Sequence, residues 1–313
     1  MSMKTGNKTK AVGIVGLGIM GGAFAKHLRA ARFAVVGFDV AHARLAMLRK
    51  LGGVVAATPA EVASTAPVLI TSLPSVEAFQ SALFEKDGIA SGARRGTIVI
   101  EASTLPLEVK ERARKRLERI GATLLDCPIS GTGAQAANKD IVIYASGNRR
   151  ACTRCNAVFT GYARKSYYCG AFGMGSRLKY IANLLVTIHN LSAAEAFVLA
   201  EHAGVDTALM YRVIKDGAGS SRMFEVRGPL MVERRYQPAT MKVDIYQKDI
   251  KIIKAFAAAL RCPTPLFTLS KRYYDAAMKE GYAQHDTAAV HAVLRRLGGR
   301  KASTARRKAT PKG

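Results

Sequence analysis

Three glycines near the start of the chain have the spacing of a phosphate-binding turn. Gly16, Gly18 and Gly21 lie in GIVGLGIMGG, directly after the apolar, strand-like run AVGIV. The first glycine permits a sharp turn, the second lets the backbone approach a pyrophosphate, and the third allows close strand–helix packing. The helix that follows offers free N–H groups and the positive end of its dipole. The stretch predicts a dinucleotide cradle, and the alternative is a tight turn without ligand. The other members of the cradle are Leu17, Ile19 and Met20.

An acidic residue follows the glycines at a meaningful distance. Asp39 ends the next apolar run, AVVGFD, roughly twenty residues further on. A carboxylate at this position accepts hydrogen bonds from the adenosine ribose and repels a 2′-phosphate. We therefore expect NAD rather than NADP as the cofactor, although His42 and Arg44 lie close enough to soften that preference.

Two further groups of residues could serve a substrate. Lys179 and Asn183 are four residues apart, so a helix places them on one face. A lysine can exchange a proton with a hydroxyl or carbonyl oxygen, while an amide orients the substrate without titrating. Spacing alone fits a surface lysine equally well. Ser130, Gly131 and Thr132 follow the run TLLD, and their small side chains suit a loop that binds an anion or an ordinary turn.

The five cysteines do not predict a disulfide framework or a metal site. Their number is odd, and Cys152 and Cys155 form a single CxxC with Cys169 nearby. A zinc site needs a second pair of ligands, so we expect reduced thiols and no metal.

The alternation of apolar runs and helical patterns predicts an α/β fold. Nearly continuous apolar strands with helices between them indicate a Rossmann-type, doubly wound and mainly parallel sheet. The helix over 105–121 is amphipathic, and its charges are expected on a solvated face. The strands of the sheet are expected at 11–17, 34–39, 67–73, 96–103, 122–130 and 140–147.

After about residue 173 the strand signals end. A long linking helix is expected over 176–204, with Ser176 as N-cap and Gly204 as its stop. Asp206 is expected to cap the next helix of an all-α domain, and further helices are expected at 249–261, 266–280 and 287–297. The expected divisions are a disordered basic N-terminus at 1–10, a dinucleotide-binding domain at 11–172, a helical substrate and dimerisation domain at 173–297 and a disordered basic tail at 298–313.

The chain is strongly basic, with a net charge of +26 over 313 residues. Eleven Lys and Arg residues in the two end segments 1–10 and 295–313 leave +15 for residues 11–294. The charge favours anionic ligands, and the tail could contact nucleic acid non-specifically. The basic stretches lack interleaved aromatic residues for base stacking, which favours a solvated surface. No apolar run approaches the ~20 residues of a membrane span, so we expect a cytoplasmic protein.

Together these motifs resemble the β-hydroxyacid dehydrogenase family, which includes 3-hydroxyisobutyrate dehydrogenase and, more distantly, 6-phosphogluconate dehydrogenase. GLGIMG is similar to its dinucleotide signature, SLPS to its cofactor loop, EASTLP to its motif beside the nicotinamide, and LDCPISGTGAQA to its substrate loop. GSRLKYIANLL resembles the catalytic helix, and QKDIKII resembles a Lys-Asp motif. The resemblance covers about residues 11 to 295.

The resemblance implies hydride transfer between NAD, or NADP, and a short β-hydroxyacid that is 3-hydroxyisobutyrate-, tartronate semialdehyde/glycerate- or threonate-like. It implies Lys179 as general acid/base, Asn183 as substrate ligand and the Ser130–Gly131–Thr132 loop as carboxylate site. It also implies a homodimer or homotetramer that uses the helical domain. The further cofactor contacts that it implies are Leu73, Pro74, Thr104 and Lys248.

Two departures affect the expected substrate. Thr132 stands where many relatives have glycine, and Ala182 stands where some have asparagine. The segments YASG and GSSRMFEVRGPLM are similar to threonate-type members, which favours a polyhydroxylated four-carbon acid. Two alternatives stay open: a non-catalytic NAD-binding protein whose tail associates with nucleic acid, and an imine reductase-like enzyme. The presence of Lys179 favours the hydroxyacid dehydrogenase over both.

Overall fold

The computed structural model describes residues 11–299, and these form two compact units. The first extends to Asn183 and the second begins at Leu184. The division falls inside a long helix, ten residues beyond its start at Met174, whereas the sequence places the boundary at 172/173. The N-terminal segment 1–10 and nearly all of the predicted tail lie outside the described residues.

A six-stranded parallel sheet forms the centre of the first unit. Its order is β3-β2-β1-β4-β5-β6. The chain therefore adds β2 and β3 on one side of β1 and then crosses over to add β4 on the other side. Ligands of such sheets bind beyond the carboxyl ends of the strands, at this switch point. The strands are β1 (Ala11–Val15), β2 (Ala34–Phe38), β3 (Val54–Val55), β4 (Val68–Thr71), β5 (Ile98–Glu101) and β6 (Thr123–Asp126).

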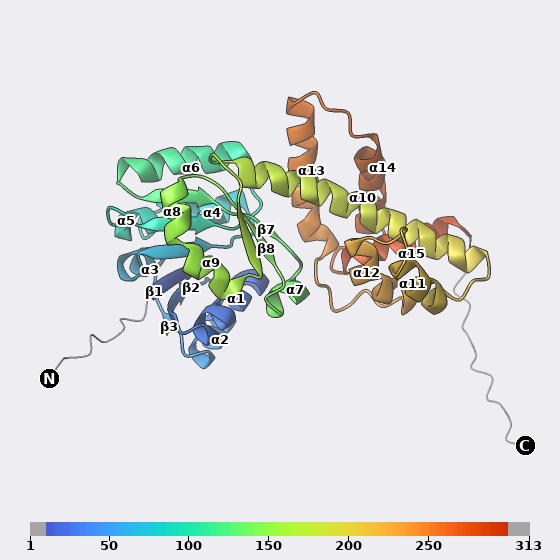
Figure 1. The fold of residues 1–313 in the computed structure, drawn as a ribbon, viewed down its shortest axis with the longest axis horizontal. Helices are drawn as coiled ribbons and strands as arrows, with labels where there is room; N and C mark the ends of the chain where they lie inside the picture. The colour runs from blue at the N-terminus through green and yellow to red at the C-terminus, as the bar shows by residue number, and fades with distance from the viewer. Residues whose placement is uncertain (1–10, 300–313) are drawn as a thin grey trace, which may run out of the picture. The chain divides into compact units, whose positions relative to one another are not determined.

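Helices cover both faces of this sheet, as its apolar strands require (Figure 1). Alternate strand residues point to the two faces, so Ile14 packs into one core and Val15 into the other. One layer contains α1 (Ile19–Ala30), α2 (His42–Lys50), α8 (Arg149–Arg154) and α9 (Asn156–Tyr162). The other contains α3 (Pro59–Thr65), α4 (Val76–Phe84), α5 (Ile89–Gly92) and α6 (Leu107–Arg119).

A second, three-stranded sheet corrects the expected topology. The run at 140–147 was expected to extend the main sheet, and that prediction is wrong. Its strand β8 (Val142–Ala145) pairs with β7 (Ile129–Ser130) and β9 (Lys165–Tyr168), while α7 (Gly133–Ala137) connects β7 to β8. A single bridge between Asp126 and Ser146 joins it to β6. Pro128, between β6 and β7, has no N–H to donate, and its carbonyl accepts the N–H of Tyr144 at 3.0 Å.

The long helix α10 (Met174–His202) begins two residues earlier than predicted. Ser176 is therefore inside the helix, and its prediction as N-cap is wrong. Gly204 follows the helix with φ +73, and this confirms the predicted stop.

One helix of the described chain, α10, is long and apolar enough to cross a membrane by length and composition alone. Its mean hydropathy reaches 1.3, so the expectation that no segment meets this criterion is wrong. The finding is weak evidence, because core helices pass the same test. Polar residues near its middle are buried and paired within the protein. Thr187 Oγ1 lies 2.9 Å from Tyr246 Oη, and Asn190 Nδ2 donates to Tyr274 Oη at 2.8 Å.

Helices alone build the described part of the second unit beyond α10. Asp206 caps α11 (Thr207–Lys215) through the N–H groups of Ala208 and Leu209, as predicted. The helix α12 was not predicted, because its sequence contains Gly228 and Pro229. The remaining elements are α12 (Arg222–Val232), α13 (Val243–Ala259), α14 (Pro265–Lys279), η1 (Thr287–Ala289) and α15 (Val290–Leu297).

Candidate active site

The glycine turn after β1 is closed at two positions and open at one. Gly16 has φ +90, and a Cβ there would lie 2.3 Å from the Ser72 carbonyl oxygen. A Cβ at Gly21 would lie 1.9 Å from the carbonyl oxygen of Gly16. At Gly18, by contrast, no heavy atom of the described residues other than its own and those of its chain neighbours lies within 4 Å of that position. The turn is therefore tightly packed against its own strands but open where a ligand would approach.

The N-terminus of α1 suits an anion. Its first turn, which includes Ile19 and Met20, contains no acidic residue, and within residues 11–299 no side chain caps it. The first N–H groups of a helix have no partner within the helix and carry the positive end of its dipole. The residues present thus fit the pyrophosphate of a dinucleotide.

Asp39 lies beside this turn at the end of β2. Its Oδ2 accepts the N–H of Leu17 at 2.6 Å, and its Oδ1 accepts the N–H of Ala41 at 2.8 Å. A carboxylate oxygen can accept more than one hydrogen bond, so both oxygens can also accept from ribose hydroxyls. The structure therefore brings the predicted ribose acceptor together with the predicted phosphate cradle.

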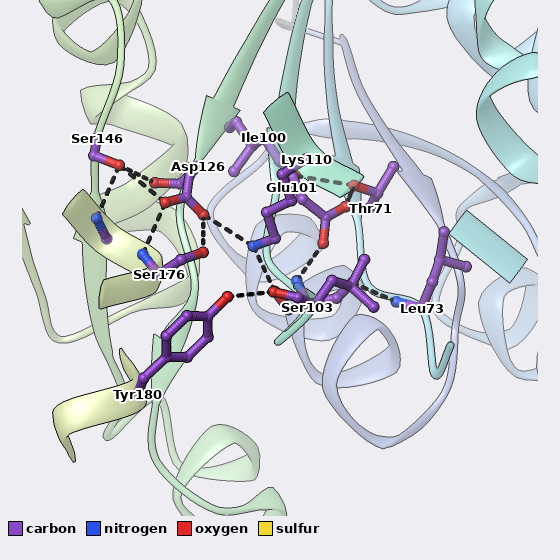
Figure 2. A network of polar contacts seen from close by, with 12 residues as sticks. Thr71, Leu73, Ile100, Glu101, Ser103, Lys110, Asp126, Ser146, Ser176 and Tyr180 are labelled. Carbon is purple, nitrogen blue, oxygen red and sulfur yellow. Dashed lines mark hydrogen bonds and ion pairs between the residues drawn. The ribbon is translucent and has the colours of Figure 1, made fainter. Parts of the chain in front are cut away.

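The loops after β4 and β5 meet at the same edge of the sheet. The N–H of Leu73 donates to Ser103 Oγ at 2.8 Å, and the N–H of Ser103 donates to Glu101 Oε1 at 2.7 Å (Figure 2). Burial raises the pKa of Glu101, and the charge of Lys110 opposes that rise. These contacts fix the predicted cofactor residues Leu73 and Pro74 against the loop that holds Thr104.

A buried ion pair lies behind these loops, and it was not predicted from the sequence. Lys110 Nζ lies 2.9 Å from Asp126 Oδ1, and both side chains are 0% exposed. The expectation that the charges of α6 lie on a solvated face is therefore wrong at Lys110. The helical period contained the signal, because Lys110 shares its face with the buried residues Ala113 and Leu117.

The first two turns of α10 are hydrogen-bonded to this edge of the sheet. Asp126 accepts the N–H of Ser176 at 2.8 Å and its hydroxyl at 2.7 Å. One turn later, Tyr180 Oη donates to the carbonyl of Leu105 at 2.5 Å. Lys179 is half-buried and Asn183 is buried on the same part of the helix. Both predicted substrate residues therefore belong to the first unit, on a helix segment tied to the loop after β5.

The loop after β6 has a more specific structure than its composition suggests. Thr132 caps α7 in a capping box: its N–H donates to Gln135 Oε1, and its hydroxyl accepts the N–H of Gln135. The Thr132 N–H is therefore not available to an anion. Among the described residues, no hydrogen bond is formed by the Ser130 hydroxyl or by the Gly131 N–H.

Lys248 lies in the second unit, on α13, with its Nζ 3.2 Å from Asp249 Oδ1. Its role toward the cofactor stays a prediction. The cysteines near β6 are thiols whose pKa burial raises, to about 11 for Cys152 and about 12 for Cys155. The residues described here contain no group of three His, Cys, Asp or Glu side chains that could hold a metal ion.

Comparisons with known proteins agree with this geometry. Residues 11–170 match the NAD binding domain of 6-phosphogluconate dehydrogenase, and residues 173–294 match the NAD-binding domain of NADP-dependent 3-hydroxyisobutyrate dehydrogenase. The chain is 36% identical to the L-threonate dehydrogenase of Escherichia coli K12 over 92% of this chain and 95% of that protein. It is 34% identical to the L-threonate dehydrogenase of Cupriavidus necator over 90% and 95% of the two chains.

A solved structure extends the likeness to three dimensions. The 3-hydroxyisobutyrate dehydrogenase from Salmonella typhimurium is 32% identical, with a TM-score of 0.83 over 91% of this chain and 99% of that one. Both the dinucleotide-binding sheet and the helical region are therefore shared with enzymes of one family. The chain belongs to the β-hydroxyacid dehydrogenases, and it is an NAD(P)-dependent oxidoreductase that acts on hydroxyacids.

Proposed function

We propose that this enzyme oxidises a polyhydroxylated four-carbon acid of the L-threonate type, with NAD as the preferred acceptor. Five relatives that are 31–36% identical over at least 90% of the chain are named L-threonate dehydrogenase. The geometric observation that carries the mechanism is the attachment of α10. Its Lys179 segment is hydrogen-bonded to the same edge of the sheet that holds the glycine cradle.

In the proposed mechanism, the cradle from Gly16 to Gly21 holds the pyrophosphate and Asp39 holds the ribose. Leu73, Pro74 and Thr104 bind the nicotinamide half. When bound, the dinucleotide supplies the hydride acceptor. Asp39 accounts for the preference for NAD, since its carboxylate repels a 2′-phosphate.

Lys179 removes the proton from the substrate hydroxyl during oxidation and returns it during reduction. Asn183 lies one turn further along the same face and orients that hydroxyl by hydrogen bonding. The Ser130 hydroxyl and the Gly131 N–H bind the substrate carboxylate. Thr132 has its own hydroxyl and N–H engaged with Gln135, so it shapes the loop rather than contacts the acid.

We also propose that the chain forms a homo-oligomer. Leu178, Ile181 and Leu185 are exposed on α10 at spacings of three and four residues, which is an apolar stripe on one helix. Such a stripe favours burial against a second copy. Light scattering at micromolar concentration checks this, and a monomeric mass would contradict it.

The substrate is tested by NADH formation at mildly alkaline pH with purified protein. The panel contains L-threonate, D-threonate, 3-hydroxyisobutyrate, glycerate and 3-hydroxypropionate. We expect L-threonate to give the highest kcat/KM. A higher value with 3-hydroxyisobutyrate would overturn the substrate, and an unchanged rate in Lys179→Ala would overturn the catalytic residue.

A further inference from the structure

In the buried ion pair of Lys110 and Asp126, both carboxylate oxygens accept hydrogen bonds. Asp126 Oδ1 accepts from Lys110 Nζ at 2.9 Å and from Ser176 Oγ at 2.7 Å. Oδ2 accepts from the Ser176 N–H at 2.8 Å and from Ser146 Oγ at 3.1 Å. Removing two charges from water is costly, and such a pair forms only where additional hydrogen bonds satisfy the ions. This pair meets that condition with groups from four separate segments (Figure 2).

The carboxylate of Asp126 acts as the N-cap of α10 from another element. A helix is normally capped by the residue that precedes its first turn, but here the acceptors come from β6 and from the residue after β8. Ser146 Oγ accepts the N–H of Gly175 at 3.0 Å, next to the bond from Ser176. A negative charge at the positive end of a 29-residue helix is favourable. The start of α10 is therefore fixed to the sheet by charge as well as by hydrogen bonds.

The lysine of the pair is hydrogen-bonded to the loop after β5, which in turn contacts the loop after β4. These two loops are called the cofactor loops below. Lys110 Nζ donates to the carbonyl of Ser103 at 2.7 Å, and Ser103 Oγ accepts the N–H of Leu73 at 2.8 Å. The carbonyl of Leu105, in the same loop as Ser103, accepts a hydrogen bond from the Tyr180 hydroxyl. One ion pair thus connects the two cofactor loops to the helix segment that contains Lys179.

We infer that Lys110 and Asp126 are positioning residues for the reaction, which act by holding Lys179 in register with the loop of residues 101–106. The inference rests on the proposed function of Lys179. Lys179 lies three residues after Ser176 and directly before Tyr180, so two anchored residues flank it on the helix. A shift of the helix start would displace its amine from the substrate hydroxyl, and misplacement of about 1 Å can cost two orders of magnitude in rate.

The experiment compares Lys110→Met and Asp126→Asn with the full-length wild type in the presence of saturating NAD. Concentrations of active sites are set by NAD binding, so loss of folded protein does not count as loss of rate. We expect kcat to fall 10- to 100-fold in each variant, while the dissociation constant for NAD changes less than threefold. We expect the double variant to lose no more than the more damaged single variant, because the pair acts as one unit.

A second measurement follows the helix directly. Amide hydrogen exchange of peptides that cover residues 174–181 is expected to speed up at least tenfold in both variants, while peptides of α14 exchange as in the wild type. Lys115→Met, an exposed lysine on the same helix as Lys110, is the matched control and keeps wild-type kcat and exchange. If Asp126→Asn does not fold, Ser176→Ala and Tyr180→Phe replace it, each with an expected 3- to 10-fold loss of kcat.

The inference would be overturned by unchanged kcat in Lys110→Met together with unchanged kcat in Asp126→Asn, or in the Ser176→Ala and Tyr180→Phe variants that replace it. This holds whether or not the exchange rates rise. Faster exchange with normal kcat would mean that the pair only stabilises the fold. Failure of the proposed function looks different, because the wild type would then oxidise none of the acids or Lys179→Ala would retain its rate. Exchange at residues 174–181 would still show whether the pair anchors the helix.

Discussion

Among the described residues, each unit contains a deeply buried ion pair, Lys110–Asp126 in the first and Arg227–Asp286 in the second, and the two pairs join different segments. In the first unit, Lys110 and Asp126 join the cofactor loops to the helix that contains Lys179. In the second unit, Arg227 Nε lies 3.3 Å from Asp286 Oδ1, with side chains 2% and 0% exposed. Asp286 also accepts from the backbone of Met241 and of Ala288, so this pair joins a connecting segment to α12 and η1. Similar chemistry therefore positions a site in one unit and closes a helical core in the other.

We expect the largest effect on stability from Arg227→Met, which breaks the ion pair of the second unit. This change leaves Asp286 buried without its cation, and breaking such a pair costs about 3–5 kcal/mol of unfolding free energy. We expect that loss in chemical denaturation, together with a kcat per NAD-binding site within twofold of the wild type. Lys110→Met is expected to lose kcat instead. A variant of Arg227 that folds normally but turns over tenfold more slowly would remove the distinction between the two pairs.

The second unit is also expected to be the acid-sensitive one. His291 is fully buried, and burial lowers its pKa from 6.5 to about 4, although the charge of Glu201 opposes that shift. Between these pH values the unfolded chain binds a proton that the folded unit does not. The unfolding free energy therefore falls as the pH drops from 6.5 toward 4, by about 3 kcal/mol.

Denaturation at pH 7, 5.5 and 4.5 measures this slope. His291→Gln should flatten it, since the replacement does not titrate. An identical slope in the wild type and in this variant would assign the acid sensitivity to other groups.

The smallest predicted effect concerns Asp39, beside the glycine cradle of the first unit. Its replacement is expected to change the selection between NAD and NADP rather than the stability of the fold. Asp39→Ala removes the carboxylate that we propose binds the ribose and repels a 2′-phosphate. We expect the ratio of kcat/KM for NADP to that for NAD to rise about tenfold, as one like charge near the surface contributes on the order of 1–2 kcal/mol. The unfolding free energy should change little. A ratio equal to that of the wild type would place the selection elsewhere.

The two regions of the site differed in how far the sequence predicted them. The cradle was predicted in detail because its signal is local: Gly16, Gly18 and Gly21 act through backbone geometry within one turn, and Asp39 ends the adjoining strand. The long helix and the helical second unit were also predicted, since apolar periodicity determines them. The roles of Lys179, Asn183 and Lys248 stay predictions, since nothing in the geometry tests them directly.

The ion pair could not be predicted in the same way. Lys110 and Asp126 are 16 residues apart, and Asp126 and Ser176 are 50 apart, so their meeting depends on the packing of four segments. A basic helix over 107–119 suggests a solvated face, and only the shared face of Lys110, Ala113 and Leu117 contradicts that. Ser176 was mistaken for an N-cap because its type fits a cap, whereas the acceptors came from elsewhere in the chain. The separate sheet of β8 was missed because short strands do not reveal their partners.

Single-turnover oxidation of L-threonate by the wild type and by Lys179→Ala tests whether Lys179 is the general acid/base of the reaction. Enzyme in excess is mixed with L-threonate and saturating NAD, and NADH appearance is followed, while NAD affinity is measured separately. We predict a rate constant about 10²- to 10⁴-fold lower in the variant, as expected for loss of a general acid/base, with NAD affinity unchanged. A rate constant within threefold of the wild type would contradict it.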